Sequence, residues 1–329
     1  MTVNFIRVCG AFMIFLCHAC NESGNALLGI FSQFFNVGVP IFFMLAGYLY
    51  STKKPPNSVL KWYLRRIKRL IIPLYIFLAM LMAAYWISGR SIHTAVWIQS
   101  ILPVCGLTQK YISGCGHLWF ITHLLICYLT VPLLQRWRTT FVKAASIWCG
   151  TVIWGGLAVL LAYTVEPIWC TLLNSFFDFW VGFCLLPIVL QKRRHFLKPV
   201  IFAIGSCSLR VFFRFTLDDT PLYNSVLTQI TSVILAVAII DFLFGVGTYW
   251  KEHGGSVMEK TMAILSSHTY EFYLVHYVFL NGTFKLHVFE NYILNVVTAF
   301  FFSIIAAIII HFLSEILQGN IQKGVKKCL

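Results

Sequence analysis

Two residues of the first apolar segment are spaced so that both can serve one reaction. Arg7 and His18 are eleven residues apart, which in an α-helix is about three turns and places them on one face, about 16 Å from each other. A neutral imidazole accepts a proton near pH 7, whereas a guanidinium stays charged and holds anions. The pair predicts a functional site in which His18 accepts a proton and Arg7 holds an anion. The alternative is an Arg7 that reaches the membrane surface and a His18 satisfied by core contacts.

Further polar residues fall inside other apolar segments, at a depth similar to that of His18. An ionised side chain at mid-bilayer costs about 2.5–3.5 kcal/mol, so such residues are functional candidates. We expect a polar layer in the outer leaflet that binds substrate. Its alternative, for Asp178 with Arg210 or Arg214, is a structural ion pair between helices. The predicted substrate-binding residues are His117, Asp178, Arg210, Arg214 and His276.

The elements that must position these residues are membrane helices. Of 329 residues, 59% are hydrophobic and 11% charged, whereas an ordinary soluble domain has about 25% charged residues. A spanning helix needs about 20 mostly apolar residues. We expect an all-α integral membrane protein of about ten transmembrane helices in one domain, residues 1–313. The predicted spans are 3–20, 27–50, 70–88, 116–135, 144–164, 175–191, 199–216, 225–246, 263–280 and 292–313.

The basic residues predict how these spans are oriented. The 25 Lys and Arg exceed the 11 acids, giving a net charge of +14. Nineteen of the 25 fall in connections and ends on one side of the predicted membrane and three on the other, the positive-inside pattern. Both termini are therefore expected in the cytoplasm, in a multi-pass protein of the cell membrane. Because the basic residues occur in short runs between apolar segments, nucleic-acid binding is not expected.

Three connecting or terminal segments carry predictions of their own. Segment 51–69 has seven basic residues and no acid, and from Val59 it is typical of a basic amphipathic helix on the cytoplasmic interface. Segment 89–115 contains an apolar stretch too short to cross, so we expect a re-entrant or surface helix there. Residues 314–329 are expected to form an amphipathic cytoplasmic tail, either an end or a linker to a further cytoplasmic domain.

The cysteines of segment 89–115 are candidates for a disulfide. Cys105 and Cys115 are ten residues apart and can pair if the segment faces an oxidising compartment. Cys20 and Cys170 are the other candidates, and the pairing stays open.

The motifs along the chain resemble those of the acyltransferase-3 integral membrane family. They follow one another in order and span nearly the whole chain. Position 46 is Ala, where the family pattern usually has Ser. The matching segments are Arg7-x10-His18, GVPIFFMLAGY at 38–48, YLRRIKRLIIP at 63–73, GHLWFI at 116–121 and SHTYEFYLVH at 267–276.

This resemblance implies a membrane acyltransferase. In that family a ten-helix bundle takes an acyl group, usually acetyl, from cytoplasmic acyl-coenzyme A and delivers it to an outside acceptor, commonly a cell-envelope glycan. The matching His18 is then the general base on an acceptor hydroxyl or the acyl carrier. Arg65, Arg66 and Arg69, with Arg7, are expected to hold the coenzyme A phosphates, although topology setting and anionic-lipid binding also explain this cluster. No metal ion is expected.

A second resemblance implies another function. With no external hydrolase-like domain and a cytoplasmic end, the chain looks like the membrane half of the membrane-bound serine racemases of vancomycin-resistance clusters. There a similar domain precedes a cytoplasmic racemase, the expected partner, and is proposed to import L-serine. In this alternative Arg210 or Arg214 holds the substrate carboxylate and Asp178 its ammonium group. A third alternative is an exporter or exchanger of envelope precursors.

Overall fold

The computed structural model describes residues 1–142, 144–164, 167–191, 196–217 and 220–327. Four basic residues counted above, Lys143, Lys192, Arg193 and Arg194, lie outside the described residues, as do the last two residues of the predicted tail. In the described ranges the regular elements are all helices. An apolar chain in lipid must satisfy its backbone polar groups internally, and the helix does this within one segment.

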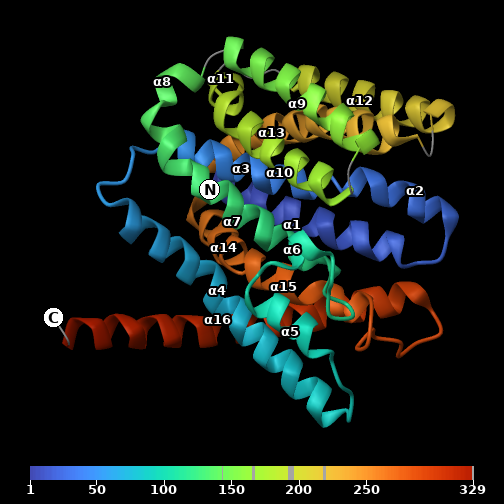
Figure 1. Ribbon diagram of the computed structural model, residues 1–329, viewed down its shortest axis with the longest axis vertical. Helices are drawn as coiled ribbons and strands as arrows, with labels where there is room; N and C mark the ends of the chain where they lie inside the picture. Colours follow the sequence, from blue (N-terminus) through green and yellow to red (C-terminus); the bar gives the residue numbers. More distant parts are fainter. Residues whose placement is uncertain (143, 165–166, 192–195, 218–219, 328–329) are drawn as a thin grey trace. The chain divides into compact units, whose positions relative to one another are not determined.

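Nine helical stretches in the described ranges are long and apolar enough to cross a membrane, which confirms an all-α integral membrane bundle (Figure 1). They comprise α1 (Thr2–Asn21), α2 and α3 (Ala26–Phe35, Gly38–Ser51), α4 (Val59–Ile87), η1 and α7 (Gly116–Leu118, Trp119–Arg136), α9 (Ala144–Thr164), α10 and α11 (Pro167–Cys184, Leu186–Val189), α12 (Leu197–Leu217), η2 and α13 (Tyr223–Leu227, Thr228–His253) and α16 (Tyr292–Lys327). The remaining helices are α5 (Thr94–Ile101), α6 (Cys105–Thr108), α8 (Arg138–Phe141), α14 (Gly255–Ser267) and α15 (Thr269–Leu280).

The predicted span 263–280 is divided into two helices. Helix α14 ends at Ser267, and α15 begins at Thr269. Ser266, Ser267 and Thr269 lie at this break, and Ser and Thr hydroxyls in general compete with the helical ladder for backbone hydrogen bonds. The Ser267 hydroxyl itself contacts a side chain, at 3.1 Å from His268 Nδ1. This polar run interrupts the apolar helix, so α15 presents its side chains from a short helix of 12 residues.

Helix α4 combines the basic part of segment 51–69 and the predicted span 70–88 in one continuous helix. The prediction of a distinct interfacial helix before the span is wrong, because α4 runs without interruption from Val59 through Pro73 to Ile87. Ser58 begins it by accepting a hydrogen bond from the Lys61 backbone N–H at 3.4 Å. Helix α16 likewise continues past the predicted start of the tail at Ser314 as far as Lys327. In segment 89–115 the expected short helix is confirmed as α5.

The helices form two compact units. Unit 1 comprises residues 1–17, 26–57 and 126–266, and unit 2 comprises 18–25, 58–125 and 267–329. In unit 1, α3 and α10 approach closely at two glycines. A Cβ atom at Gly47 would overlap the Phe179 carbonyl, and one at Gly182 would overlap the Met44 backbone. Gly38 likewise allows close helix contact, because a Cβ atom there would overlap the Gly10 carbonyl of α1.

Unit 2 holds the last turn of α1, then α4, α5, α6, η1, the start of α7, α15 and α16. Two long-range hydrogen bonds connect α4 with the α15 region. The Tyr270 hydroxyl donates to the Leu70 carbonyl at 2.8 Å, and the Tyr85 hydroxyl donates to the Thr283 hydroxyl at 2.7 Å. These bonds fix α15 along α4, with the basic half of α4 next to the start of α15.

Candidate active site

Three histidines predicted from separate motifs lie together in unit 2. His18 comes from the last turn of α1, His117 from η1 and His276 from α15. The ring centroids of His18 and His276 are 5.3 Å apart, and those of His117 and His276 are 5.2 Å apart. The Tyr277 ring contacts two of them, at 4.2 Å from His18 and 5.5 Å from His117. The sequence predicts that these histidines lie at a similar depth. The structure adds that the rings of His18 and His117 both contact the ring of His276.

Backbone carbonyls fix the proton positions on two of these rings. His117 Nε2 lies 3.1 Å from the Leu274 carbonyl, which only accepts, so Nε2 carries the proton. His276 Nδ1 lies 2.8 Å from the Tyr273 carbonyl and carries its proton for the same reason. In a neutral imidazole the other nitrogen is an acceptor. His117 Nδ1 is buried and has no hydrogen-bond partner among the described residues. It is therefore an acceptor nitrogen to which no group of the described residues donates.

Two tyrosine hydroxyls hold the backbone at these histidines. The Tyr273 hydroxyl donates to the His117 carbonyl, and the Tyr292 hydroxyl donates to the Ala19 carbonyl, one residue after His18. Neither role is predicted by the sequence. Tyr273 stands inside the SHTYEFYLVH motif, but which carbonyl its hydroxyl reaches depends on the packing of α15 against η1.

The other predicted substrate-binding residues lie in unit 1 and make different contacts. The Asp178 carboxylate accepts a hydrogen bond from the Gln229 amide at 2.7 Å. The Arg210 guanidinium donates to the Ser232 hydroxyl at 3.0 Å. Both residues are buried, and Arg214 is half-buried. Among the described residues no ion pair joins Asp178 to Arg210, because Gln229 and Ser232 of α13 are their hydrogen-bond partners.

The predicted donor-binding arginines lie on α4. Arg65 and Arg69 are exposed, and the half-buried Arg66 places its guanidinium 5.8 Å from the centroid of the Trp62 ring. Leu70, which accepts the hydrogen bond from Tyr270 of α15, follows Arg69 directly. From Tyr270 to His276 is six residues, about 9 Å along a helix. Arg7 lies in α1 and belongs to unit 1.

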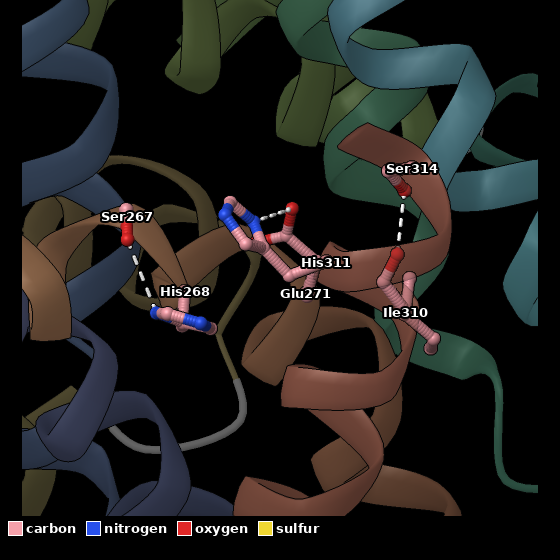
Figure 2. A network of polar contacts seen from close by, with 6 residues as sticks. All are labelled: Ser267, His268, Glu271, Ile310, His311 and Ser314. Carbon is pink, nitrogen blue, oxygen red and sulfur yellow. Dashed lines mark hydrogen bonds and ion pairs between the residues drawn. The ribbon is translucent and has the colours of Figure 1, made fainter. Parts of the chain in front are cut away.

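A second polar network in unit 2 comprises His268, Glu271 of α15 and His311 of α16 (Figure 2). His311 Nδ1 of α16 is 3.0 Å from the carboxylate of the buried Glu271, and the rings of His311 and His268 are 4.4 Å apart. This network joins α15 to α16. His311 falls within a long apolar run, and its partner could not be read from the sequence because it lies forty residues earlier.

The cysteines of segment 89–115 are free thiols. Cys105 and Cys115 are buried thiols, and Cys20 and Cys170 are free as well, so the disulfide considered from the sequence is not formed. Burial raises the pKa of both the Cys105 and the Cys115 thiol, because the thiolate loses its hydration there. These thiols are therefore poor nucleophiles at neutral pH. Within the described residues no group of three or more His, Cys, Asp or Glu is placed to hold a metal ion.

A cluster of imidazoles between the helices of a membrane bundle can move protons in a group-transfer reaction. The family model described as an acyltransferase domain, Acyl_transf_3, matches residues 2–312. The chain therefore belongs to the acyltransferase-3 family and is a multi-pass membrane acyltransferase. No curated protein and no solved structure matches the chain.

Proposed function

We propose that the protein transfers an acyl group, in the first place acetyl, from cytoplasmic acyl-coenzyme A to a hydroxyl of an extracytoplasmic acceptor of the cell envelope. The observation that carries this proposal is the histidine cluster of unit 2. His18 lies in ring contact with His276 and Tyr277, and the fixed protonation of His117 and His276 leaves each with one acceptor nitrogen.

Acyl transfer from a thioester to an alcohol needs one group that moves a proton. The acceptor oxygen forms a bond to the thioester carbonyl carbon, and the hydroxyl proton passes to an imidazole nitrogen of His18. The carbon–sulfur bond then breaks, and the proton passes from the imidazole to the departing sulfur. The products are an ester and free coenzyme A, and His18 returns to its neutral form. If His18 instead carries the acyl group, the same proton passes through His276 or His117.

The basic half of α4 supports the choice of donor. Arg65 and Arg69 present exposed guanidinium groups to a polyanion, and arginine pairs with phosphate through two parallel hydrogen bonds. Because Tyr270 bonds to Leu70, this basic surface and the helix that carries His276 meet in one unit. A donor held there by its phosphates has its acyl arm free to extend along α15 toward the cluster.

The test uses purified protein in proteoliposomes with acetyl-coenzyme A labelled in the acetyl group. We expect saturable binding that weakens at high salt, and about 5- to 30-fold weaker binding for the Arg65→Ala/Arg66→Ala variant, the loss of about 1–2 kcal/mol. Lys53→Ala/Lys54→Ala removes the same charge from the predicted cytoplasmic side outside α4 and serves as the control. His18→Ala should retain binding and lose transfer by about 10²- to 10⁴-fold.

The contrary outcomes are specific. If the wild-type protein neither binds acetyl-coenzyme A nor transfers label to envelope material, the proposal fails. If the α4 variant and its lysine control weaken acetyl-coenzyme A binding equally, the basic half of α4 contributes only non-specific charge and is not the donor-binding site. Serine uptake stays a prediction from the sequence, and labelled serine offered to the same proteoliposomes, with protein-free liposomes beside them, measures it directly.

A further inference from the structure

The end of α1 and the end of α15 contact each other through two matched pairs of side chains. On α1, the Glu22 backbone N–H donates to the His18 carbonyl at 3.0 Å, so Glu22 lies one turn beyond His18 on the same face. On α15, the Asn281 backbone N–H donates to the Tyr277 carbonyl at 2.8 Å, which sets the same spacing. The His18 ring faces the Tyr277 ring, and Glu22 faces Asn281 and the Tyr277 hydroxyl.

Two of the three side-chain hydrogen bonds of this contact converge on one carboxylate oxygen. The Tyr277 hydroxyl donates to Glu22 Oε1 at 3.1 Å, and the Asn281 amide donates to the same oxygen at 2.5 Å. The second amide hydrogen of Asn281 is directed to the Tyr277 oxygen at 3.1 Å. A carboxylate is an acceptor only, so the phenol hydroxyl points to Glu22 and the ring plane of Tyr277 is set by that bond.

In the part of the chain that the structure describes, no side-chain hydrogen bond fixes the His18 imidazole in this way. Among the described residues its imidazole makes ring contacts with Tyr277, at 4.2 Å, and His276, at 5.3 Å. Ring packing of this kind restrains an imidazole only as firmly as the packing partner is held. The orientation of His18 therefore depends on the groups that fix Tyr277.

We propose that Glu22 is a positioning residue for His18 and that it acts through Tyr277. This inference rests on the proposed function, in which His18 takes the acceptor proton. The Glu22 carboxylate fixes the Tyr277 ring against the imidazole, and its negative charge, one turn away, stabilises the positive charge that the imidazole acquires when it accepts that proton. Glu22 neither gains nor loses a proton in the reaction. The rings that contact His18, those of His276 and Tyr277, carry no negative charge in their neutral forms.

Two substitutions at Glu22 separate the hydrogen bonds from the charge. In Glu22→Gln the side-chain carbonyl still accepts from Tyr277 and Asn281, whereas in Glu22→Ala both bonds are lost. We expect kcat to fall about 30- to 100-fold in Glu22→Ala and about 3- to 10-fold in Glu22→Gln, because misplacing a catalytic group by about 1 Å costs about 10²-fold. The KM for acetyl-coenzyme A should stay within about twofold in both.

The controls are a matched acid and a matched tyrosine variant. Glu290 is an exposed carboxylate of the connection before α16, and Glu290→Gln removes one negative charge without a change in kcat. Tyr277→Phe keeps the ring against His18 but removes the hydroxyl that Glu22 holds, so it should lower kcat by about as much as Glu22→Ala. Thermal unfolding of each variant establishes that it is folded before kinetics are compared.

A readout that needs no acyl transfer separates this inference from the proposed function. Carbethoxylation of His18 by diethylpyrocarbonate, followed by mass spectrometry in detergent, reports how firmly the imidazole is held. We expect the rate at His18 to rise at least about threefold in Glu22→Ala and to stay near wild type in Glu22→Gln and Glu290→Gln. If wild-type protein transfers no acyl group but this pattern holds, the proposed function fails and the positioning stands. Unchanged carbethoxylation in Glu22→Ala, or equal kcat losses for Gln and Ala, overturns the inference.

Discussion

Removing Glu271 and His311 singly and together measures how strongly α16 holds α15. The Glu271 carboxylate and His311 Nδ1 are 3.0 Å apart (Figure 2), with the glutamate side chain 7% exposed and the histidine 26% exposed. When His311 is protonated, two unit charges at that separation attract by about 5 kcal/mol at an effective dielectric constant of about 20. Partial exposure of His311 screens this attraction, and desolvation of the carboxylate opposes it. A net coupling of about 1.5–3 kcal/mol remains, the range for a hydrogen bond to a charged group.

The assay is a double-mutant cycle on free energies of unfolding, measured by titrating detergent-solubilised protein with a denaturing detergent. The cycle uses Glu271→Ala, His311→Ala and the double variant. Ser314, one turn beyond His311, donates its hydroxyl to the Ile310 carbonyl of its own helix and has no bond to α15 in Figure 2. A second cycle between Glu271→Ala and Ser314→Ala should therefore give a coupling near zero. A Glu271–His311 coupling below about 0.5 kcal/mol would refute the reasoning, because the pair would then behave as an exposed one.

Two further predictions concern the packing of segment 89–115: glycine substitutions and the reactivity of its thiols. Gly114 has φ +77° and no room for a Cβ atom beside the Asn281 carbonyl, whereas Gly89 has φ +65° and open space. Ala at Gly89 should cost about 1 kcal/mol of stability and Ala at Gly114 about 1–3 kcal/mol more; equal losses in thermal unfolding would contradict the close approach. The Cys105 and Cys115 thiols, whose pKa values burial raises, should react slowly with a maleimide at pH 7 and faster as pH rises. Since the folded pKa lies above the unfolded one, their contribution to stability is complete below about pH 8.5 and falls at higher pH. Rapid labelling of folded protein at pH 7 would show that these thiols are not buried.

Much of the architecture follows from the sequence because the membrane restricts the choices. An apolar stretch of sufficient length in lipid must be a helix, so the positions of most spans could be read from hydropathy. The spacing of Arg7 and His18 within one helix follows from its fixed rise and rotation. Where local chemistry competes with the helix, as at Ser267 and His268, or where a helix continues through a polar boundary, as at Ser58 to Ile87, hydropathy misplaces the element.

The partners of each polar residue were decided by the packing between helices. Depth counting placed His18, His117 and His276 at one level, but it placed Asp178 and Arg210 at that level too, and these bind Gln229 and Ser232 instead. Depth fixes one coordinate of a side chain, along the membrane normal. The other two depend on which helices are neighbours and how each is rotated about its axis.

The sequence by itself determined that this protein is an all-helical membrane acyltransferase with a histidine in its first span. Composition, hydropathy and motif order can be read from the sequence because they depend on the residues of single segments and not on contacts between segments. The tertiary structure decided that His18 meets His276 and Tyr277 and that Glu22 holds the Tyr277 hydroxyl. Those contacts join residues more than 250 positions apart, and their existence depends on side-chain packing, which no local periodicity contains.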